Sequence, residues 1–126
     1  MNQFQTLTIF KKQLLLFMDE LIEQFPFEPD FKILKIFFQN QIPIETCLNS
    51  FKRFLNKNEG GMRLIITARD DAFFFKENYL KFIMSDDKMN HFKKLWFDST
   101  FTVECKNTVW AWIDLFVKIA DKPTIE

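Results

Sequence analysis

Residues 103–120 read VECKNTVWAWIDLFVKIA, and this stretch decides the expected fold. Its apolar positions recur at the spacing of one helix face, about 3.6 residues. They are Cys105, Val109, Trp112, Ile113, Phe116, Val117 and Ala120. Lys118 and Pro123 close the segment, as basic residues and prolines do at helix C-termini. We therefore predict a helix from Thr102 or Val103 to Ala120.

The same periodicity recurs towards the N-terminus. Residues 3–24 carry apolar side chains at helical spacing, and the proline-containing turn 25–29 ends them, because each proline biases its predecessor away from α geometry. Asp30 and Pro43 suit the first turns of two further helices. The run Ser85-Asp86-Asp87 predicts another helix start, since carboxylates are favourable where first-turn N–H groups are unpaired.

One segment is polar and contains both glycines of the chain. Residues 56–61 read NKNEGG, which predicts a surface loop rather than a linker between domains. We expect a short helix after it, from Met62 to about Arg69, and a further helical turn or two over residues 70–75.

These elements predict an all-α fold, because no segment shows sustained alternation of apolar and polar residues. We expect a single compact helical bundle of about five to seven helices that forms one domain over residues 1–126. The residues expected to share its core are Leu21, Phe37, Phe51, Phe92, Trp96, Ile113 and Phe116.

The charge balance restricts the partners that we expect. Lys and Arg number 17, and Asp and Glu number 17, so the formal net charge is zero at pH 7. The field that steers a protein onto nucleic acid or anionic lipid is therefore absent, although Lys11-Lys12, Lys52-Arg53 and Lys93-Lys94 form local basic spots. No stretch approaches the roughly 18 apolar residues of a membrane span. We expect a soluble, intracellular protein.

The residues that carry chemistry have simpler structural roles. His91 is the only histidine, and Cys47 and Cys105 lie far apart at apolar-periodic positions, so no zinc-type grouping is visible. The pairs Asp70-Asp71 and Asp86-Asp87 lie where helices start, and capping explains them. We predict no catalytic, metal-binding or cofactor-binding residue, no small-molecule substrate and no cofactor, and hence a protein that is not an enzyme.

Large aromatic residues exceed what one helix face can bury. Successive helical residues lie about 100° apart, so Phe73, Phe74 and Phe75 cannot all enter one stripe, and Trp110 falls on the flank of the stripe that contains Trp112. The surplus indicates either helices buried on two sides or a surface for a partner. Our hypothesis is a protein-binding patch of Phe73, Phe74, Phe75 and Trp110, with Lys106 and Asp114 as rim charges.

The order of five motifs resembles a family of short, uncharacterised helical proteins of nucleocytoplasmic large DNA viruses, the giant viruses. The motifs are FMDELIEQFP (17–26), residues 30–45 with Phe37-Phe38, ARDDAFF (68–74), KMNHFKKLW (88–96) and TVWAWIDLF (108–116).

The family has no activity to carry over to particular residues. With the aromatic surplus, the resemblance implies a small non-enzymatic viral protein that binds a viral or host protein, or a second copy of itself. Its location would be the virion or the viral factory in the host cytoplasm. The alternative is a nucleic-acid-associated accessory factor of viral replication or packaging.

Overall fold

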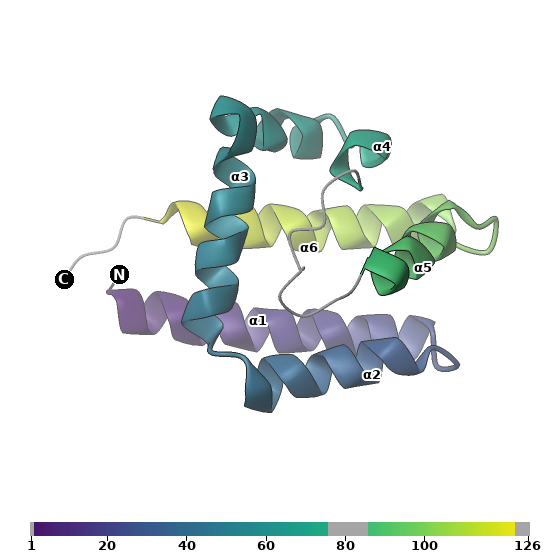
Figure 1. Cartoon of the computed structure of the whole chain (residues 1–126), viewed down its shortest axis with the longest axis horizontal. Coiled ribbons are helices and arrows are strands. Elements are labelled where there is room, and N and C mark those ends of the chain that lie inside the picture. The colour runs from purple at the N-terminus through teal and green to yellow at the C-terminus, as the bar shows by residue number, and fades with distance from the viewer. Residues whose placement is uncertain (1, 76–85, 123–126) are drawn as a thin grey trace. The chain divides into compact units, whose positions relative to one another are not determined.

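The computed structural model describes residues 2–75 and 86–122, and the fold over these residues is all-α, as predicted. It contains seven helical segments and no strand within the described ranges (Figure 1). The segments are α1 (Gln3–Gln24), α2 (Pro29–Ile36), the π-helical turn η1 (Phe37–Gln41), α3 (Ile44–Thr67), α4 (Asp71–Phe74), α5 (Asp86–Phe97) and α6 (Val103–Asp121).

The chain divides into two compact units. Unit 1 consists of Met1–Asn49 and Lys118–Glu126, and unit 2 consists of Ser50–Val117. Leu21 is buried in unit 1, and the core positions that were expected and found buried in unit 2 are Phe51, Trp96, Ile113 and Phe116. Phe92 is half-buried. The single domain over residues 1–126 stays a prediction.

Unit 1 begins with a helical hairpin of α1 and α2, which run side by side in opposite directions (Figure 1). Asn2 caps α1: its side-chain oxygen accepts a hydrogen bond from the backbone N–H of Gln5 at 2.8 Å, and the Gln5 side chain accepts one from the Asn2 N–H. The predicted bounds of α1 are confirmed. Its buried stripe consists of Thr6, Phe10, Leu14, Met18 and Leu21.

The buried face of α2 continues into η1 and corrects one predicted core residue. Phe31, Leu34 and Phe38 are buried, whereas Phe37 is exposed. These three follow each other at i, i+3 and i+7, so they form one stripe, and Phe37 lies about 90° from its centre. The expectation that Phe37 belongs to the core is therefore wrong, and Phe38 takes that place.

The glycine-containing segment is helical rather than a loop, because α3 continues through residues 56–61. Met62 and Ile66 are buried four residues apart, which keeps the second half of α3 packed. Gly60 has φ +84°, a left-handed conformation that favours glycine, and α3 changes direction in its second half (Figure 1). The predicted break is thus a bend, and the predicted short helix from Met62 is the end of α3.

The remaining helix starts of unit 2 follow the capping rules. Asp70 caps α4 by accepting a hydrogen bond from the Phe73 N–H at 3.3 Å. Asp86 lies in the first turn of α5, as predicted, while Ser85 lies outside the described residues. Thr102 accepts a hydrogen bond from the Cys105 N–H at 3.2 Å, and α6 begins at Val103 as expected.

Candidate functional site

The predicted aromatic patch is mostly interior. Phe73 is 50% exposed, but Phe74, Phe75 and Trp110 are buried in unit 2. One of the three successive phenylalanines therefore does face away from the core, as the helical geometry requires. The expectation that Phe74 or Phe75 and Trp110 lie on the surface is wrong, because these rings pack on neighbouring aromatic rings within unit 2.

Five rings of unit 2 pack together, and we call them the aromatic cluster: Phe54, Phe74, Phe75, Trp96 and Trp110. Phe74 and Trp96 make most of the ring contacts within it. The Phe74 ring makes edge contacts with Phe54, Phe75 and Trp110, with ring centroids 5.6, 5.4 and 5.2 Å away. Trp96 lies 5.6 Å from Trp110 and is almost completely buried. Such edge-to-face contacts stabilise aromatic pairs beyond their area of burial. The sequence left two interpretations of the aromatic surplus open. The cluster agrees with the one in which helices are buried on two sides.

Trp110 and Trp112 take the opposite places from those expected. Trp110 is buried and Trp112 is half-buried. On an ideal helix Trp110 lies about 90° and Trp112 about 70° from the centre of the Val109-Ile113-Phe116 stripe, so periodicity barely separates them. The rings of Phe74 and Trp96 pack on the Trp110 side, and this tertiary contact decides the outcome.

Polar and charged side chains border the same cluster. The buried indole N–H of Trp96 donates a hydrogen bond to an Asp71 carboxylate oxygen at 3.0 Å. The Lys106 ammonium lies over the Trp96 ring, 5.8 Å from its centroid, and 5.6 Å from that of Phe97. Lys106 is thus held against rings of its own unit, whereas the sequence suggested a rim charge for a partner.

Asp114 has a partner that the sequence did not reveal. The Arg69 guanidinium donates two hydrogen bonds to its carboxylate, at 2.9 and 2.6 Å, and lies over the Trp110 ring at 5.4 Å. These bonds to Asp114 raise the pKa of Arg69 above its usual value. Because Arg69 lies in the turn after α3 and Asp114 lies 45 positions later on α6, no local pattern could pair them.

A contiguous apolar surface lies instead on the solvent side of α2 and of the first residue of η1. Ile33, Ile36 and Phe37 are 42%, 53% and 39% exposed. Their i, i+3, i+4 spacing places them on one face, opposite the buried Phe31-Leu34-Phe38 stripe. We call these three residues the outer stripe. The sequence prediction placed Phe37 in the core and did not identify this second apolar face.

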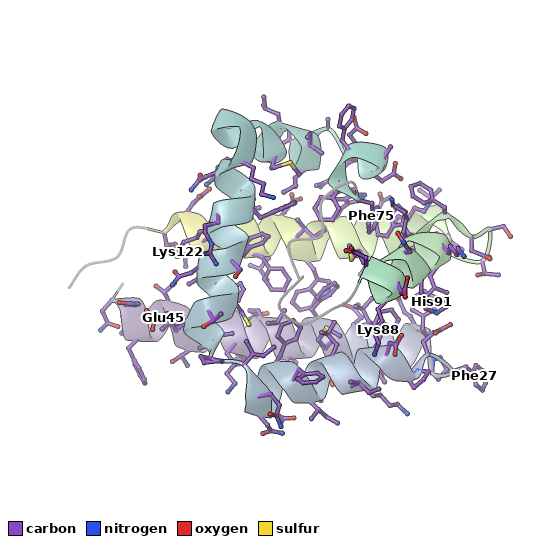
Figure 2. The ribbon with its side chains drawn as sticks, in the orientation of Figure 1. Phe27, Glu45, Phe75, Lys88, His91 and Lys122 are labelled. Carbon is purple, nitrogen blue, oxygen red and sulfur yellow. The ribbon has the colours of Figure 1, made fainter. Side chains whose placement is uncertain are left out.

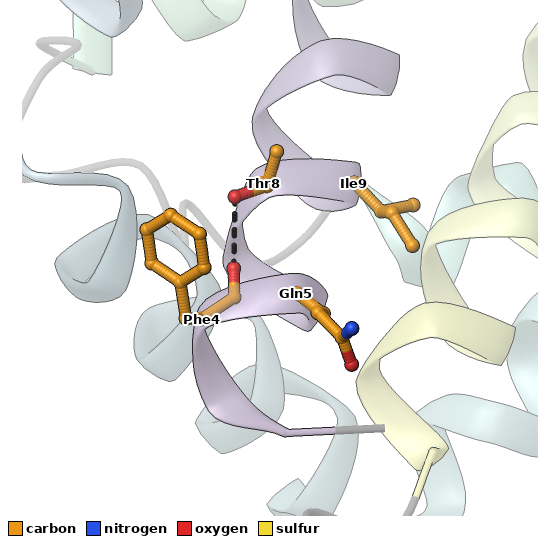
Figure 3. A pocket seen from close by; sticks show the side chains of 4 residues that line it. All are labelled: Phe4, Gln5, Thr8 and Ile9. Carbon is orange, nitrogen blue, oxygen red and sulfur yellow. Dashed lines mark hydrogen bonds between the residues drawn. The ribbon is translucent and has the colours of Figure 1, made fainter.

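A shallow hollow lies on the first turns of α1 (Figure 3). It has a volume of about 350 Å³ and is lined by Phe4, Gln5, Thr8 and Ile9. The Thr8 hydroxyl is already engaged, because it donates a hydrogen bond to the Phe4 carbonyl at 2.9 Å. The four residues come from one helix and include no ionisable group, so this hollow lacks the convergent polar groups of a catalytic pocket.

The titratable candidates do not converge either. Burial raises the pKa of the Cys47 thiol to about 11, which makes it a poor nucleophile at neutral pH. His91 lies on the surface of α5 (Figure 2). Among the described residues, no three His, Cys, Asp or Glu side chains are placed to hold a metal ion. None of the helices in the described ranges is long and apolar enough to cross a membrane.

No protein family model matches this sequence, and neither a curated protein nor a solved structure shows significant similarity to it.

Proposed function

We propose that this chain is a small non-enzymatic viral protein that acts by binding another protein, in the virion or in the viral factory of the host cytoplasm. The observation that supports the proposal is the outer stripe of α2. Contiguous exposed apolar side chains favour aggregation unless a partner covers them. The viral setting rests on the resemblance in motif order between residues 17 and 120.

The surroundings of the outer stripe suggest the chemistry of the partner. Lys32 is exposed one turn before Ile36, so a cation borders the apolar face. Lys35 is engaged within the hairpin, because its ammonium forms an ion pair with Asp19 of α1. A partner with apolar anchors and a carboxylate at its edge fits this surface. It is a viral or host protein or a second copy of the chain.

A pair of matched substitutions tests the proposal. Ile36→Asp places a charge in the outer stripe, and Gln39→Asp places the same charge at an exposed position in η1. We expect Ile36→Asp to weaken recovery of the partner from infected cells by tenfold or more, since apolar anchors dominate interfaces, while Gln39→Asp retains it. Equal recovery with both variants would contradict a role for the outer stripe.

One observation keeps a nucleic-acid role as the second candidate. Arg53 and Lys57 are exposed one turn apart on α3, and such cations are the groups that neutralise phosphates in nucleic-acid complexes. An accessory factor of replication or packaging would bind DNA or RNA at physiological salt and lose affinity steeply as salt is added. The Arg53→Gln/Lys57→Gln double variant would then reduce the salt dependence, whereas Ile36→Asp would leave it unchanged.

A further inference from the structure

Arg69 stands out in unit 2 because it combines an unfavourable backbone conformation with an unusual number of side-chain contacts. Its φ is +56°, and in the described part of the chain it is the one residue other than glycine with a positive φ. It follows the end of α3, where the N–H groups of Arg69 and Asp70 donate to the carbonyls of Ile66 and Ile65, both at 3.0 Å. This is the Schellman arrangement, in which glycine is the usual residue.

The side chain of Arg69 holds this turn against α6. Its guanidinium donates two hydrogen bonds to Asp114 and a third to the Ile66 carbonyl at 3.1 Å, and it covers the Trp110 ring. The strained backbone and the ion pair therefore belong to the same residue. The side chains of Arg69 and Asp114 are 39% and 41% exposed to solvent.

α4 begins directly after this turn and is only four residues long. It is also attached by the Asp71–Trp96 hydrogen bond and by the packing of Phe74 and Phe75 on the aromatic cluster. Opening at Arg69 would relieve backbone strain and uncover Phe74 and Trp110 together. An isolated helical turn has little stability of its own, since helix nucleation is unfavourable.

We propose that the Arg69–Asp114 pair is a latch: it holds α4 closed over Trp96 and Trp110, and α4 opens locally when the latch is released. The aromatic rings of this cluster are then exposed to solvent only in the open state. This device is independent of the outer stripe, which lies in unit 1.

Hydrogen exchange of the Phe74 and Phe75 amides tests the latch, since these N–H groups donate to the Asp70 and Asp71 carbonyls, both at 3.0 Å, only while α4 is formed. We expect Asp114→Asn to accelerate their exchange about tenfold and to leave the amides in the middle of α6 unchanged. Arg69→Gly removes the pair and also the strain, so exchange should be several-fold slower than in Asp114→Asn. The Arg69→Gly/Asp114→Asn double variant should show the same exchange rates as Arg69→Gly.

The matched control is Asp98→Asn, because the Asp98 carboxylate accepts hydrogen bonds from the backbone N–H and hydroxyl of Thr100, in the turn before α6. It should leave the Phe74 and Phe75 amides unchanged. An equal acceleration across α4, α5 and α6 in Asp114→Asn would show that the pair stabilises unit 2 as a whole and would overturn the latch. Unchanged exchange at Phe74 and Phe75 would overturn it as well.

Discussion

The α1–α2 hairpin of unit 1 and the aromatic cluster of unit 2 bury their apolar side chains in different ways. The hairpin joins two helices that are neighbours in sequence, and each contributes one regular stripe. The cluster collects rings from α3, α4, α5 and α6 around Trp96 and Phe74. Helical periodicity therefore describes the hairpin well, whereas long-range packing decides which rings of unit 2 are buried.

The largest expected effect tests the cluster. Phe74→Ala should lower the free energy of unfolding by about 3–5 kcal/mol, because it removes a ring that three aromatic neighbours surround. Phe73→Ala is the matched control and should change it by about 1 kcal/mol or less, since Phe73 is half exposed. Urea unfolding followed by circular dichroism measures both. Similar values for the two variants would remove the distinction between the core ring and the surface ring.

The hairpin allows the same comparison of a buried and an exposed ring, with a smaller expected loss of stability. Phe38→Ala should cost about 3 kcal/mol, since Phe38 continues the buried stripe of α2. Phe37→Ala should cost about 1 kcal/mol or less but should weaken partner binding, because Phe37 belongs to the outer stripe. Unfolding curves and a binding assay on the same two proteins separate the effects. If Phe37→Ala is the more destabilising variant, the assignment of faces on α2 is reversed.

The bend in α3 predicts a smaller change. Gly60→Ala should destabilise the protein by about 1 kcal/mol, although no heavy atom lies within 4 Å of the added methyl group, because alanine is strained at φ +84°. Thermal unfolding measures it. An increase in stability would mean that α3 passes through residue 60 with ordinary helical geometry.

The smallest effect at neutral pH concerns Cys47 of unit 1. Its pKa is raised from 9.0 to about 11, so the folded state binds the thiol proton more tightly than the unfolded state. Stability from this group is complete below about pH 9 and falls as the pH rises towards 11. Cys47→Ala should show a weaker decline over this range in unfolding measurements. Thiol-reactive reagents should modify Cys105, which is half-buried, faster than Cys47.

Individual residues show how far the sequence could predict this structure. The bounds of α1 and the start of α6 were predicted because capping residues and apolar stripes agree there. Phe37 was predicted to be in the core, although helical geometry places it about 90° from the centre of the buried Phe31-Leu34-Phe38 stripe. The prediction of a loop at residues 56–61 was wrong, because the burial of Met62 and Ile66 outweighs the low helix propensity of glycine.

The candidate site was less predictable than the fold, for a physical reason. Trp110 and Trp112 are almost equivalent by helical angle, and only the rings of Phe74 and Trp96 select between them. Arg69 forms its ion pair with Asp114, which is 45 positions away in the sequence, so no local pattern predicts the contact. The outer stripe needed no tertiary information, since two apolar faces on one short helix are visible in the residue spacing of α2.

A photo-crosslinking residue placed at position 36, and in a separate protein at position 73, tests the central claim most directly in infected cells or purified particles. Both positions are about half exposed, one in the outer stripe and one beside the aromatic cluster. We predict protein adducts from position 36 and none from position 73, because the partner covers α2 while the cluster belongs to the core. Adducts from position 73 with none from position 36 would contradict this account.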